Sequence, residues 1–288
     1  MKPAVSVIVP TYNRASFLKK ALESLAQQTF KDFEIIVIDD GSNDETPDII
    51  KTYLPKINPR SLISIVSKEN HGVSWARNQG ILKSQASWIA FLDSDDAWIP
   101  RKLEVQMKYL ERNPDIKICQ TEEIWIRNGR RVNPMKKHAK LGGNIFERCL
   151  ELCVVSPSAT VVSRKLLDEV GLFDESLPAC EDYDLWLRIS YRYPIALISE
   201  ALIIKQGGHE DQLSRKYPAM DLYRIQAIQN LLDHHSLSEE QTTQALGELQ
   251  KKCGIFIKGA KNRGKLEEAG VAKPGSDSQD TRRIPRYR

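Results

Sequence analysis

The segment WIAFLDSDDAWIP (88–100) places three carboxylates directly after a short apolar run that is typical of a buried strand. These carboxylates belong to Asp93, Asp95 and Asp96. Neighbouring carboxylates raise one another's pKa, and burying one without a partner costs on the order of a few kcal/mol. The cluster therefore requires either water or a cation, and its position at a strand end predicts a crevice at that point.

Three earlier apolar runs also have strand length, and segments with helical periodicity separate them. The runs are VSVIV (5–9), EIIVID (34–39) and LISIV (62–66). Alternating strands and helices are typical of an α/β sheet whose neighbouring strands run parallel. Strands that are apolar at nearly every position are buried on both faces. The sequence therefore predicts a mostly parallel central sheet with helices on both sides.

Polar residues stand at the carboxyl ends of these predicted strands. They are Thr11, Tyr12 and Asn13 after the first strand, Asp39 and Asp40 after the second, and residues 93–96 after the fourth. In parallel α/β sheets, ligands bind in the crevice outside the carboxyl ends of the strands. We therefore expect these side chains to converge on one binding site.

After residue 115 the pattern indicates shorter elements. Strands are predicted at 115–120, 123–127, 158–163 and 194–199, and helices at 144–153, 164–171, 181–192, 217–233 and 238–257. The first of these strands and helices extend the central sheet, whereas the last two helices form an appendage. We therefore predict a domain at 1–215, with halves at 1–115 and 116–215, and a helical extension at 216–260.

Composition is that of an ordinary globular protein, with 41% hydrophobic and 28% charged residues in a chain of 288. No apolar run approaches the roughly 18 residues of a membrane-spanning helix. The first residues show no signal-peptide cleavage site, so we expect a cytoplasmic protein. Five scattered cysteines without a C-x-x-C pair indicate reduced, mostly buried thiols.

The last residues, 261–288, are rich in Gly, Lys, Arg and Ser and poor in large apolar side chains. This composition predicts a solvated, disordered tail. An alternative interpretation is peripheral contact between this basic tail and anionic lipid head groups at the inner face of the membrane. No motif for nucleic-acid binding is present, so we expect no nucleic-acid partner.

Five motifs resemble the inverting family 2 glycosyltransferases, which have the nucleotide-sugar-binding GT-A fold. In order along about residues 4–215, the motifs are VSVIVPTYNR (5–14), EIIVIDDGSNDET (34–46), HGVSWARNQGI (71–81), FLDSDD (91–96) and EDYDLWLR (181–188). The resemblance implies a Rossmann-like sheet flanked by helices. Residues 1–115 would then form the nucleotide-sugar-binding half of the domain, and residues 116–215 the acceptor-binding half.

The resemblance also implies a donor site for a nucleotide-diphosphate sugar, with UDP as the expected nucleotide. The implied nucleotide-sugar-binding residues are Pro10, Thr11, Tyr12, Asp39, Arg77, Asp93 and Ser94. Thr11 and Tyr12 would line the nucleobase and ribose pocket, and Asp39 would accept a hydrogen bond from the base. Arg77 would approach the base or the diphosphate.

A divalent cation, Mn²⁺ or Mg²⁺, is implied at Asp95 of the D-x-D motif. The departing nucleoside diphosphate carries about two to three negative charges, which a hard cation bound by carboxylate oxygen stabilises. In GGHEDQLSR (207–215), His209 is a second candidate metal ligand. A lone surface or capping histidine is the alternative for His209, and a solvated turn is the alternative for residues 93–96.

Asp182 matches the family position of the general base. In an inverting transfer, the acceptor hydroxyl loses its proton as it attacks the anomeric carbon. Helix position alone favours another role, because a carboxylate in the first turn of a helix is stabilised by the helix dipole. The resemblance therefore carries the assignment of Asp182 as the base.

Together these features predict a metal-dependent, inverting hexosyltransferase of polysaccharide biosynthesis, acting on a hydroxyl of a glycan or lipid-linked glycan. One alternative is a nucleotide-sugar-binding module without transfer activity. Another is a nucleotidyltransferase, which needs a glycine-rich basic loop after the first strand, but VPTYNRASF (9–17) has no glycine. The sequence leaves the sugar, the acceptor and the oligomeric state open.

Overall fold

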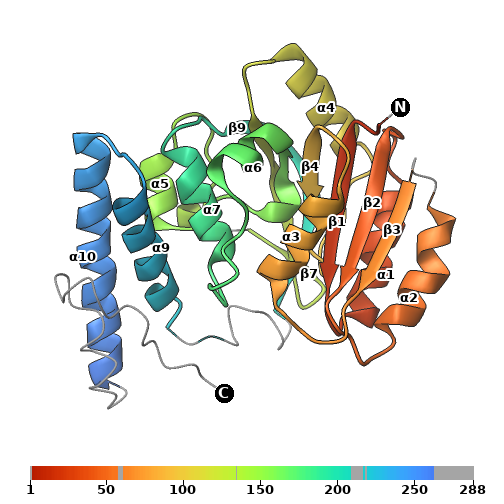
Figure 1. Cartoon of the computed structure of the whole chain (residues 1–288), viewed down its shortest axis with the longest axis horizontal. Coiled ribbons are helices and arrows are strands. Elements are labelled where there is room, and N and C mark those ends of the chain that lie inside the picture. Colours follow the sequence, from red (N-terminus) through yellow and green to blue (C-terminus); the bar gives the residue numbers. More distant parts are fainter. Residues whose placement is uncertain (1, 58–60, 134, 209–216, 218, 263–288) are drawn as a thin grey trace.

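The computed structural model describes residues 2–57, 61–133, 135–208, 217 and 219–262. Within these residues, nine strands form one sheet with helices on both faces (Figure 1). The strands are β1 (Val5–Thr11), β2 (Phe33–Asp39), β3 (Ser61–Val66), β4 (Trp88–Phe91), β5 (Ala97–Trp98), β6 (Ile118–Arg127), β7 (Arg130–Val132), β8 (Thr160–Ser163) and β9 (Ala196–Gly207). The helices are α1 (Ala15–Ala26), α2 (Thr46–Tyr53), α3 (Val73–Lys83), α4 (Lys102–Arg112), α5 (Phe146–Glu151), α6 (Arg164–Val170), α7 (Glu181–Ser190), α9 (Asp221–His234) and α10 (Glu239–Asn262).

The sheet has the strand order β3-β2-β1-β4-β8-β6-β9-β5, and β7 pairs with β6. Strands β3, β2, β1 and β4 run parallel, as predicted, whereas β8 and β5 are antiparallel to their neighbours. Thr11 of β1 pairs with Asp39 of β2, so the two strands end at the same level. The predicted convergence of polar residues at one sheet edge therefore holds for these two strands.

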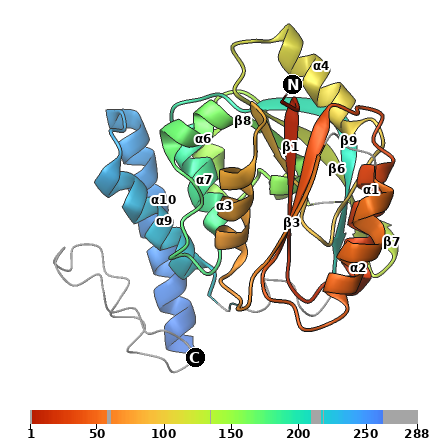
Figure 2. The ribbon, with the colours of Figure 1, turned by 45° about the vertical axis from the view of Figure 1, so that its right-hand side comes forward.

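Alternate side chains of β1 enter the two hydrophobic cores on opposite faces of the sheet. Val7 and Val9 pack with Leu18 and Leu22 of α1, whereas Ile8 packs in the core that includes α6 and α7. All seven residues of β1 are therefore buried. Helices α1 and α2 lie on one side of the sheet, and α3, α6 and α7 lie on the other (Figure 2).

The second half of the sheet differs from the predicted short strands. Residues 118–127 form one continuous strand, β6, where two strands were predicted at 115–120 and 123–127. Strand β9 extends to Gly207, eight residues beyond the predicted end at 199. Its pairing with β6 is parallel and contains register shifts on both sides of Glu122, as at a β-bulge. Strand β9 thereby reaches the end of the D-x-D segment, where it pairs with β5.

Helices α9 and α10 pack against α5 and α7 and share their hydrophobic core. The helical extension predicted at 216–260 is therefore present, and α10 continues to Asn262. The division of the chain at residue 215 stays a prediction. Apart from the last two residues of α10, the tail predicted at 261–288 lies outside the described residues, and so does its lipid contact. Among the described helices, none combines the length and the apolar character needed to cross a bilayer.

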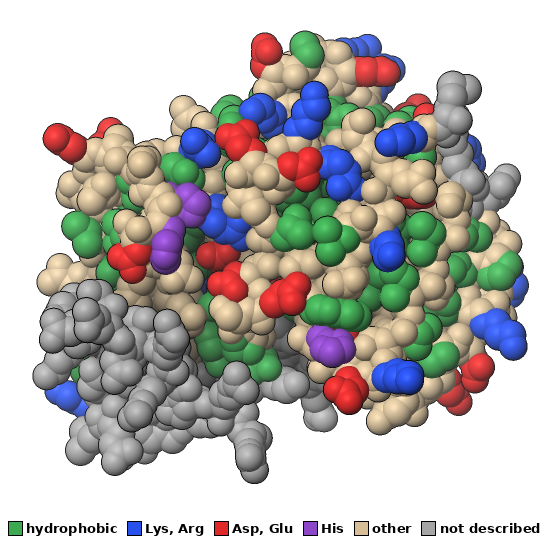
Figure 3. Space-filling model, viewed as in Figure 1, with side chains coloured by type: hydrophobic (Ala, Val, Ile, Leu, Met, Phe, Trp, Pro, Cys, Tyr) green, Lys and Arg blue, Asp and Glu red, His purple; other side chains and the backbone are tan. Residues whose placement is uncertain are grey.

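Strand β3 forms one edge of the sheet and contains no charged residue. Its Leu62 and Val66 are exposed, as is Leu82 at the end of α3. Hydrophobic side chains accordingly gather on the face of the molecule over α3 and β3 (Figure 3). All five cysteines are free thiols, as predicted, and four of them are buried.

Lys102, the first residue of α4, is fully buried with its ammonium 3.7 Å from the centre of the Trp98 ring. Among the described residues its Nζ atom has no hydrogen-bond partner. Burial lowers the pKa of Lys102 to about 7. At pH 7 this shift from 10.5 corresponds to a cost of about 5 kcal/mol, of which a cation–π contact recovers about 2 kcal/mol. We therefore expect Lys102 to destabilise the fold at neutral pH.

We predict that Lys102→Met raises the free energy of unfolding by about 3 kcal/mol at pH 7. The folded-state pKa is lowered, so wild-type stability rises with pH between about 7 and 10.5. The advantage of the variant should consequently shrink over that range. Urea unfolding at several pH values measures this, with Lys108→Met, an exposed position of α4, as the control. A Lys102→Met variant no more stable than wild type at pH 7 would contradict the prediction.

Candidate functional site

The ends of β1 and β2 form a buried, polar corner. Pro10, Thr11 and Asp39 are buried, whereas Tyr12 is 40% exposed. Oδ1 of Asp39 accepts a hydrogen bond from the backbone N–H of Ser42 at 3.0 Å. Within the described part of the chain, neither Oδ2 of Asp39 nor Oγ1 of Thr11 has a hydrogen-bond partner. Because buried polar atoms are nearly always paired, these two oxygens are suited to bind a ligand's polar groups.

Asp40, the next residue, has a structural role. Its carboxylate accepts hydrogen bonds from the backbone N–H groups of His71 and Gly72 and from the side-chain amide of Asn70. These contacts fix the loop that leads into α3, and Gly72 there adopts a φ of 101°, which favours glycine. Of these two adjacent aspartates, Asp39 therefore keeps one unpaired carboxylate oxygen, whereas Asp40 holds the loop before α3.

The residues of the D-x-D segment also separate in space. Asp96 is buried, and its Oδ1 accepts a hydrogen bond from the backbone N–H of Gln206 at 3.3 Å. Burial raises the pKa of Asp96, and the charges of Asp95 and Asp93 raise it further. Asp95 lies 3.8 Å from the Arg14 guanidinium, and Ser94 is buried. The carboxylates therefore face different partners, and protein cations offset part of their charge.

Arg77 of α3 connects two segments that lie far apart in the sequence. Its Nη2 donates to Oδ1 of Asp93 at 2.8 Å, and its Nη1 donates to Oε1 of Glu181 at 2.6 Å. Burial alone lowers the pKa of Arg77, but these two carboxylates outweigh it and the net pKa is raised. The Phe173 ring lies 5.1 Å from the guanidinium carbon. Arg77 thus holds the D-x-D segment beside the first turn of α7.

Asp182 follows Glu181 in that first turn and is partly buried. Burial and the Asp182 charge raise the pKa of Glu181 to about 7, against the opposing effect of Arg77. Cys180, which precedes both, has a φ of 64°, an uncommon conformation for a residue other than glycine. The backbone turn at Cys180 starts the helix at this point and places Glu181 and Asp182 together at its N-terminus.

Lys205 of β9, which the sequence did not single out, lies among the carboxylates of the candidate site. Its Nζ donates to Oγ of Ser156 at 3.2 Å. Burial lowers its pKa, but the surrounding carboxylates, led by Glu123 and Asp96 and including Asp182, outweigh burial and raise it. A lysine within the apolar run ALIIK (201–205) was the signal that could have identified it. Lys205 therefore supplies a positive charge between the D-x-D segment and Asp182.

The residues present fit a cation bound jointly with a diphosphate. In the described ranges, no group of three or more His, Cys, Asp or Glu side chains could hold a metal ion on its own. Mg²⁺ commonly takes only one or two protein carboxylates and completes its shell with substrate phosphates and water. Asp95, which lies between Asp93 and the buried Asp96 along the chain, suits that arrangement. His209, the second predicted metal ligand, lies outside the described residues.

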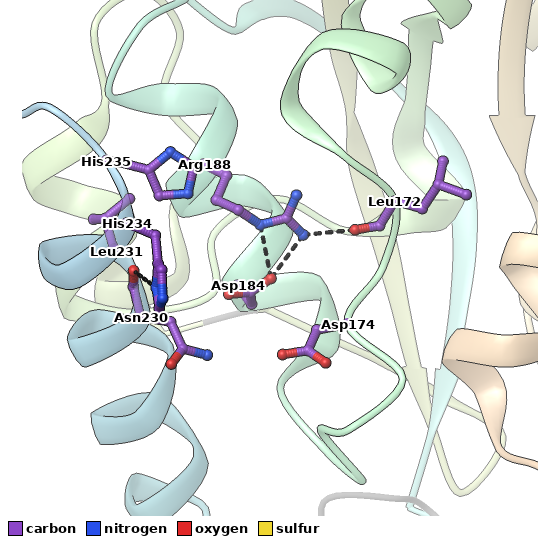
Figure 4. A pocket seen from close by; sticks show the side chains of 8 residues that line it. All are labelled: Leu172, Asp174, Asp184, Arg188, Asn230, Leu231, His234 and His235. Carbon is purple, nitrogen blue, oxygen red and sulfur yellow. Dashed lines mark hydrogen bonds and ion pairs between the residues drawn. The ribbon is translucent and has the colours of Figure 1, made fainter. Parts of the chain in front are cut away.

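A cleft of about 260 Å³ lies elsewhere, between α7, α9 and the loop before α7. Its lining residues are Leu172, Asp174, Asp184, Arg188, Asn230, Leu231, His234 and His235 (Figure 4). Arg188 donates to Asp184 and to the carbonyl oxygen of Leu172, so internal partners already satisfy its charge. None of these eight residues belongs to the predicted site.

Comparison with known sequences identifies similar proteins. Residues 6–171 match the family model described as Glycosyl transferase family 2. An uncharacterized glycosyltransferase of Rickettsia bellii is 36% identical over 198 residues, which cover 69% of this chain and 28% of the relative. An uncharacterized glycosyltransferase of Methanocaldococcus jannaschii is 34% identical over 230 residues, 77% of each chain. The chain covers between 28% and 36% of the length of three Rickettsia relatives.

Comparison with solved structures identifies similar folds. S. aureus TarS has a TM-score of 0.72 and 25% identity, over 93% of this chain and 46% of TarS. TarS 1–349 in complex with UDP-GlcNAc has a TM-score of 0.77 at 24% identity, over 94% and 79% of the chains. A mannosyltransferase from Pyrobaculum calidifontis in complex with GDP-Man and Mn²⁺ has a TM-score of 0.65 at 18% identity, with the same coverage. The predicted GT-A fold is thereby confirmed.

Proposed function

The chain belongs to glycosyl transferase family 2, and from this membership we propose that it transfers a sugar from a nucleotide-diphosphate donor to an acceptor hydroxyl. The Arg77 bridge carries this proposal. Arg77 joins Asp93, which we place with the donor, to Glu181. Glu181 precedes Asp182, which we place with the acceptor, where the acceptor hydroxyl must lose its proton. A donor-binding group and a proton acceptor at one sheet edge are the two requirements of such a reaction.

The donor side accepts a nucleotide at the ends of β1 and β2. We propose that the unpartnered Oδ2 of Asp39 accepts a hydrogen bond from an N–H of the base, and that Pro10, Thr11 and Tyr12 line the pocket. The uracil N3–H is such a donor, which supports UDP. TarS was solved with UDP-GlcNAc, a UDP-linked sugar. Asp93 and Ser94 would lie near the ribose and the diphosphate.

On the metal side, we propose that Asp95 provides the protein carboxylate for Mn²⁺ or Mg²⁺. When bound, the cation would neutralise charge on the departing diphosphate. The mannosyltransferase with a similar fold was solved with Mn²⁺. Arg77, already bound to Asp93 and Glu181, keeps the carboxylates at fixed positions, so it orients the site around the diphosphate.

For the transfer step, we propose that Asp182 removes the proton of the acceptor hydroxyl as the oxygen attacks the anomeric carbon from the face opposite the leaving group. The bond from the anomeric carbon to the diphosphate oxygen breaks, the new glycosidic bond forms, and the configuration inverts. The proton resides on Asp182 until solvent accepts it. The acceptor class we propose is a glycan or lipid-linked glycan.

A panel of nucleotide sugars tests the proposed function. The purified protein is incubated with UDP-, GDP- and dTDP-linked sugars, with Mn²⁺ or with a chelator, and release of the nucleoside diphosphate is measured. We expect slow hydrolysis of at least one UDP-sugar that requires the cation. Binding of UDP-sugars without hydrolysis, and without transfer to any of a panel of glycan acceptors, would identify a binding module instead.

We predict that Asp95→Ala removes the cation dependence of UDP binding. With wild type, replacing Mn²⁺ by chelator should weaken UDP binding by about tenfold or more, because the carboxylate, the cation and the diphosphate bind together. The variant should bind UDP weakly in both conditions. Titration calorimetry measures these affinities, with Asp48→Ala, an exposed carboxylate of α2, as the control. Equal affinity of wild type with Mn²⁺ and with chelator would exclude the metal role of Asp95.

A further inference from the structure

The thiol of Cys153 lies against the carboxylate of Asp182. Its Sγ is 3.2 Å from Oδ2 of Asp182 and 3.4 Å from the carbonyl oxygen of Val155. Hydrogen bonds to an ionised acceptor are stronger than those to a neutral one, so the thiol proton points to the carboxylate. Cys153 follows α5, whereas Asp182 begins α7, so the contact joins two separate segments.

We propose that Cys153 is a positioning residue for Asp182, whose thiol donates a hydrogen bond to Oδ2 and thereby fixes the orientation of the carboxylate and its affinity for a proton. This inference deepens the proposed function and rests on it, because it assigns a second residue to the proposed base. A carboxylate has about four lone-pair sites. The thiol and the backbone N–H of Tyr183 occupy two of them. Lone pairs of Asp182 thus stay available for an acceptor hydroxyl.

A thiol can act as this donor only if it stays protonated. Burial raises the pKa of Cys153 well above its ordinary value, and the charge of Asp182 raises it further. Cys153 is therefore a thiol at neutral pH. An S–H group is a weak donor, so it orients the carboxylate without strongly lowering its basicity. This combination suits a general base, which needs a fixed position and a high affinity for the proton.

The other groups that face Asp182 come from three elements. The carboxyl group of Glu181 lies next to it on the same helix, and the positive charges of Arg77 of α3 and Lys205 of β9 also interact with it. Cys180, also close by, has a pKa that burial raises to about 12, so it adds no charge at neutral pH. The contribution of Cys153 is therefore separable from these charges by changing Cys153 alone.

Carboxyl NMR measures the proposed effect without any substrate. Protein labelled with ¹³C at the aspartate carboxyls is titrated, and Asp182 is assigned from the signal missing in Asp182→Asn. In Cys153→Ala we expect the titration midpoint of Asp182 to rise by about half a pH unit or more, since a donor to the ionised form is lost. Cys153→Ser keeps a donor and should not raise the midpoint. Cys253→Ala, which removes a buried thiol from α10, is the control. An unchanged midpoint in folded Cys153→Ala would overturn the proposal.

Alkylation provides a second measurement that leaves Cys153 in place. Iodoacetamide reacts with thiolates, and peptide mass spectrometry separates Cys153 from the other cysteines. In Asp182→Asn the thiol loses a neighbouring charge that raises its pKa, so its alkylation at pH 8 should accelerate by about tenfold. Equal rates in wild type and variant would overturn the contact even if Cys153→Ala failed to fold.

Transfer kinetics separate this inference from the proposed function. In Cys153→Ala, the midpoint of the pH profile of kcat should follow the NMR midpoint while the donor KM stays unchanged. A purely structural role would alter stability or both kinetic parameters without moving that midpoint. If Asp182→Asn transferred at the wild-type rate, the proposed base would be wrong, whereas the NMR titration would still decide the contact with Cys153.

Discussion

Asp182→Asn is expected to lower the rate of transfer by about 10²–10⁴-fold, the usual contribution of a positioned general base. Asparagine keeps the shape of the side chain but cannot accept the proton of the acceptor hydroxyl. Donor binding should barely change, because Asp182 acts on the acceptor, whereas Asp39 and Asp95 act on the donor. The measurements are kcat for transfer and the dissociation constant of the donor–Mn²⁺ complex in both proteins.

The pH profile gives this prediction a second test. Wild-type kcat should rise with pH as Asp182 ionises and then level off, whereas the residual rate of Asp182→Asn should lack that rise. Asp233→Asn, an exposed carboxylate of α9, is the matched control and should behave as wild type. An Asp182→Asn variant with near wild-type kcat would refute the assignment. Loss of donor binding would instead place Asp182 in the nucleotide site.

Arg77→Met is expected to lower the free energy of unfolding by about 3–5 kcal/mol, because it leaves the buried carboxyl group of Glu181 without its partner and Asp93 without its cation. This corresponds to a fall in Tm on the order of 10 °C for a chain of this size. Transfer should also fall, since the D-x-D segment and α7 lose their common partner. Calorimetry measures the change in stability, and the donor assay measures the change in activity.

Two further variants separate charge from geometry at Arg77. Arg77→Lys keeps the positive charge but cannot donate from two nitrogens to two carboxylates, so it should recover only part of the stability. Glu181→Gln added to Arg77→Met removes the unpaired carboxyl group and should also recover part of the stability. If Arg77→Met unfolded at the wild-type Tm, the contacts of Arg77 with Asp93 and Glu181 would not stabilise the fold.

The sequence alone determined the parallel half of the fold and the edge of the sheet at which the polar candidate residues stand. The apolar runs that became β1 and β2 are long enough, and apolar enough at successive positions, to specify strands buried between helices. The third run also formed a strand, β3, but as an edge strand that is only partly buried. Polar residues that directly follow such strands lie at the carboxyl ends of the strands, and this position does not depend on how the rest of the chain folds. The place of Asp39 and of the D-x-D segment at the carboxyl ends of the parallel strands was therefore predictable.

Only the tertiary structure decided which of these residues have partners. Arg77 reaches Asp93 across 16 residues and Glu181 across 104, and Asp40 turned to the loop before α3 while Asp39 kept an unpaired oxygen. Local periodicity reports neighbours within a few positions along one element, so it could not show that β6 is continuous. Nor could it show that β9 brings Lys205 to the carboxylates. Those contacts depend on strand order and register, which are set by burial and pairing of the whole sheet.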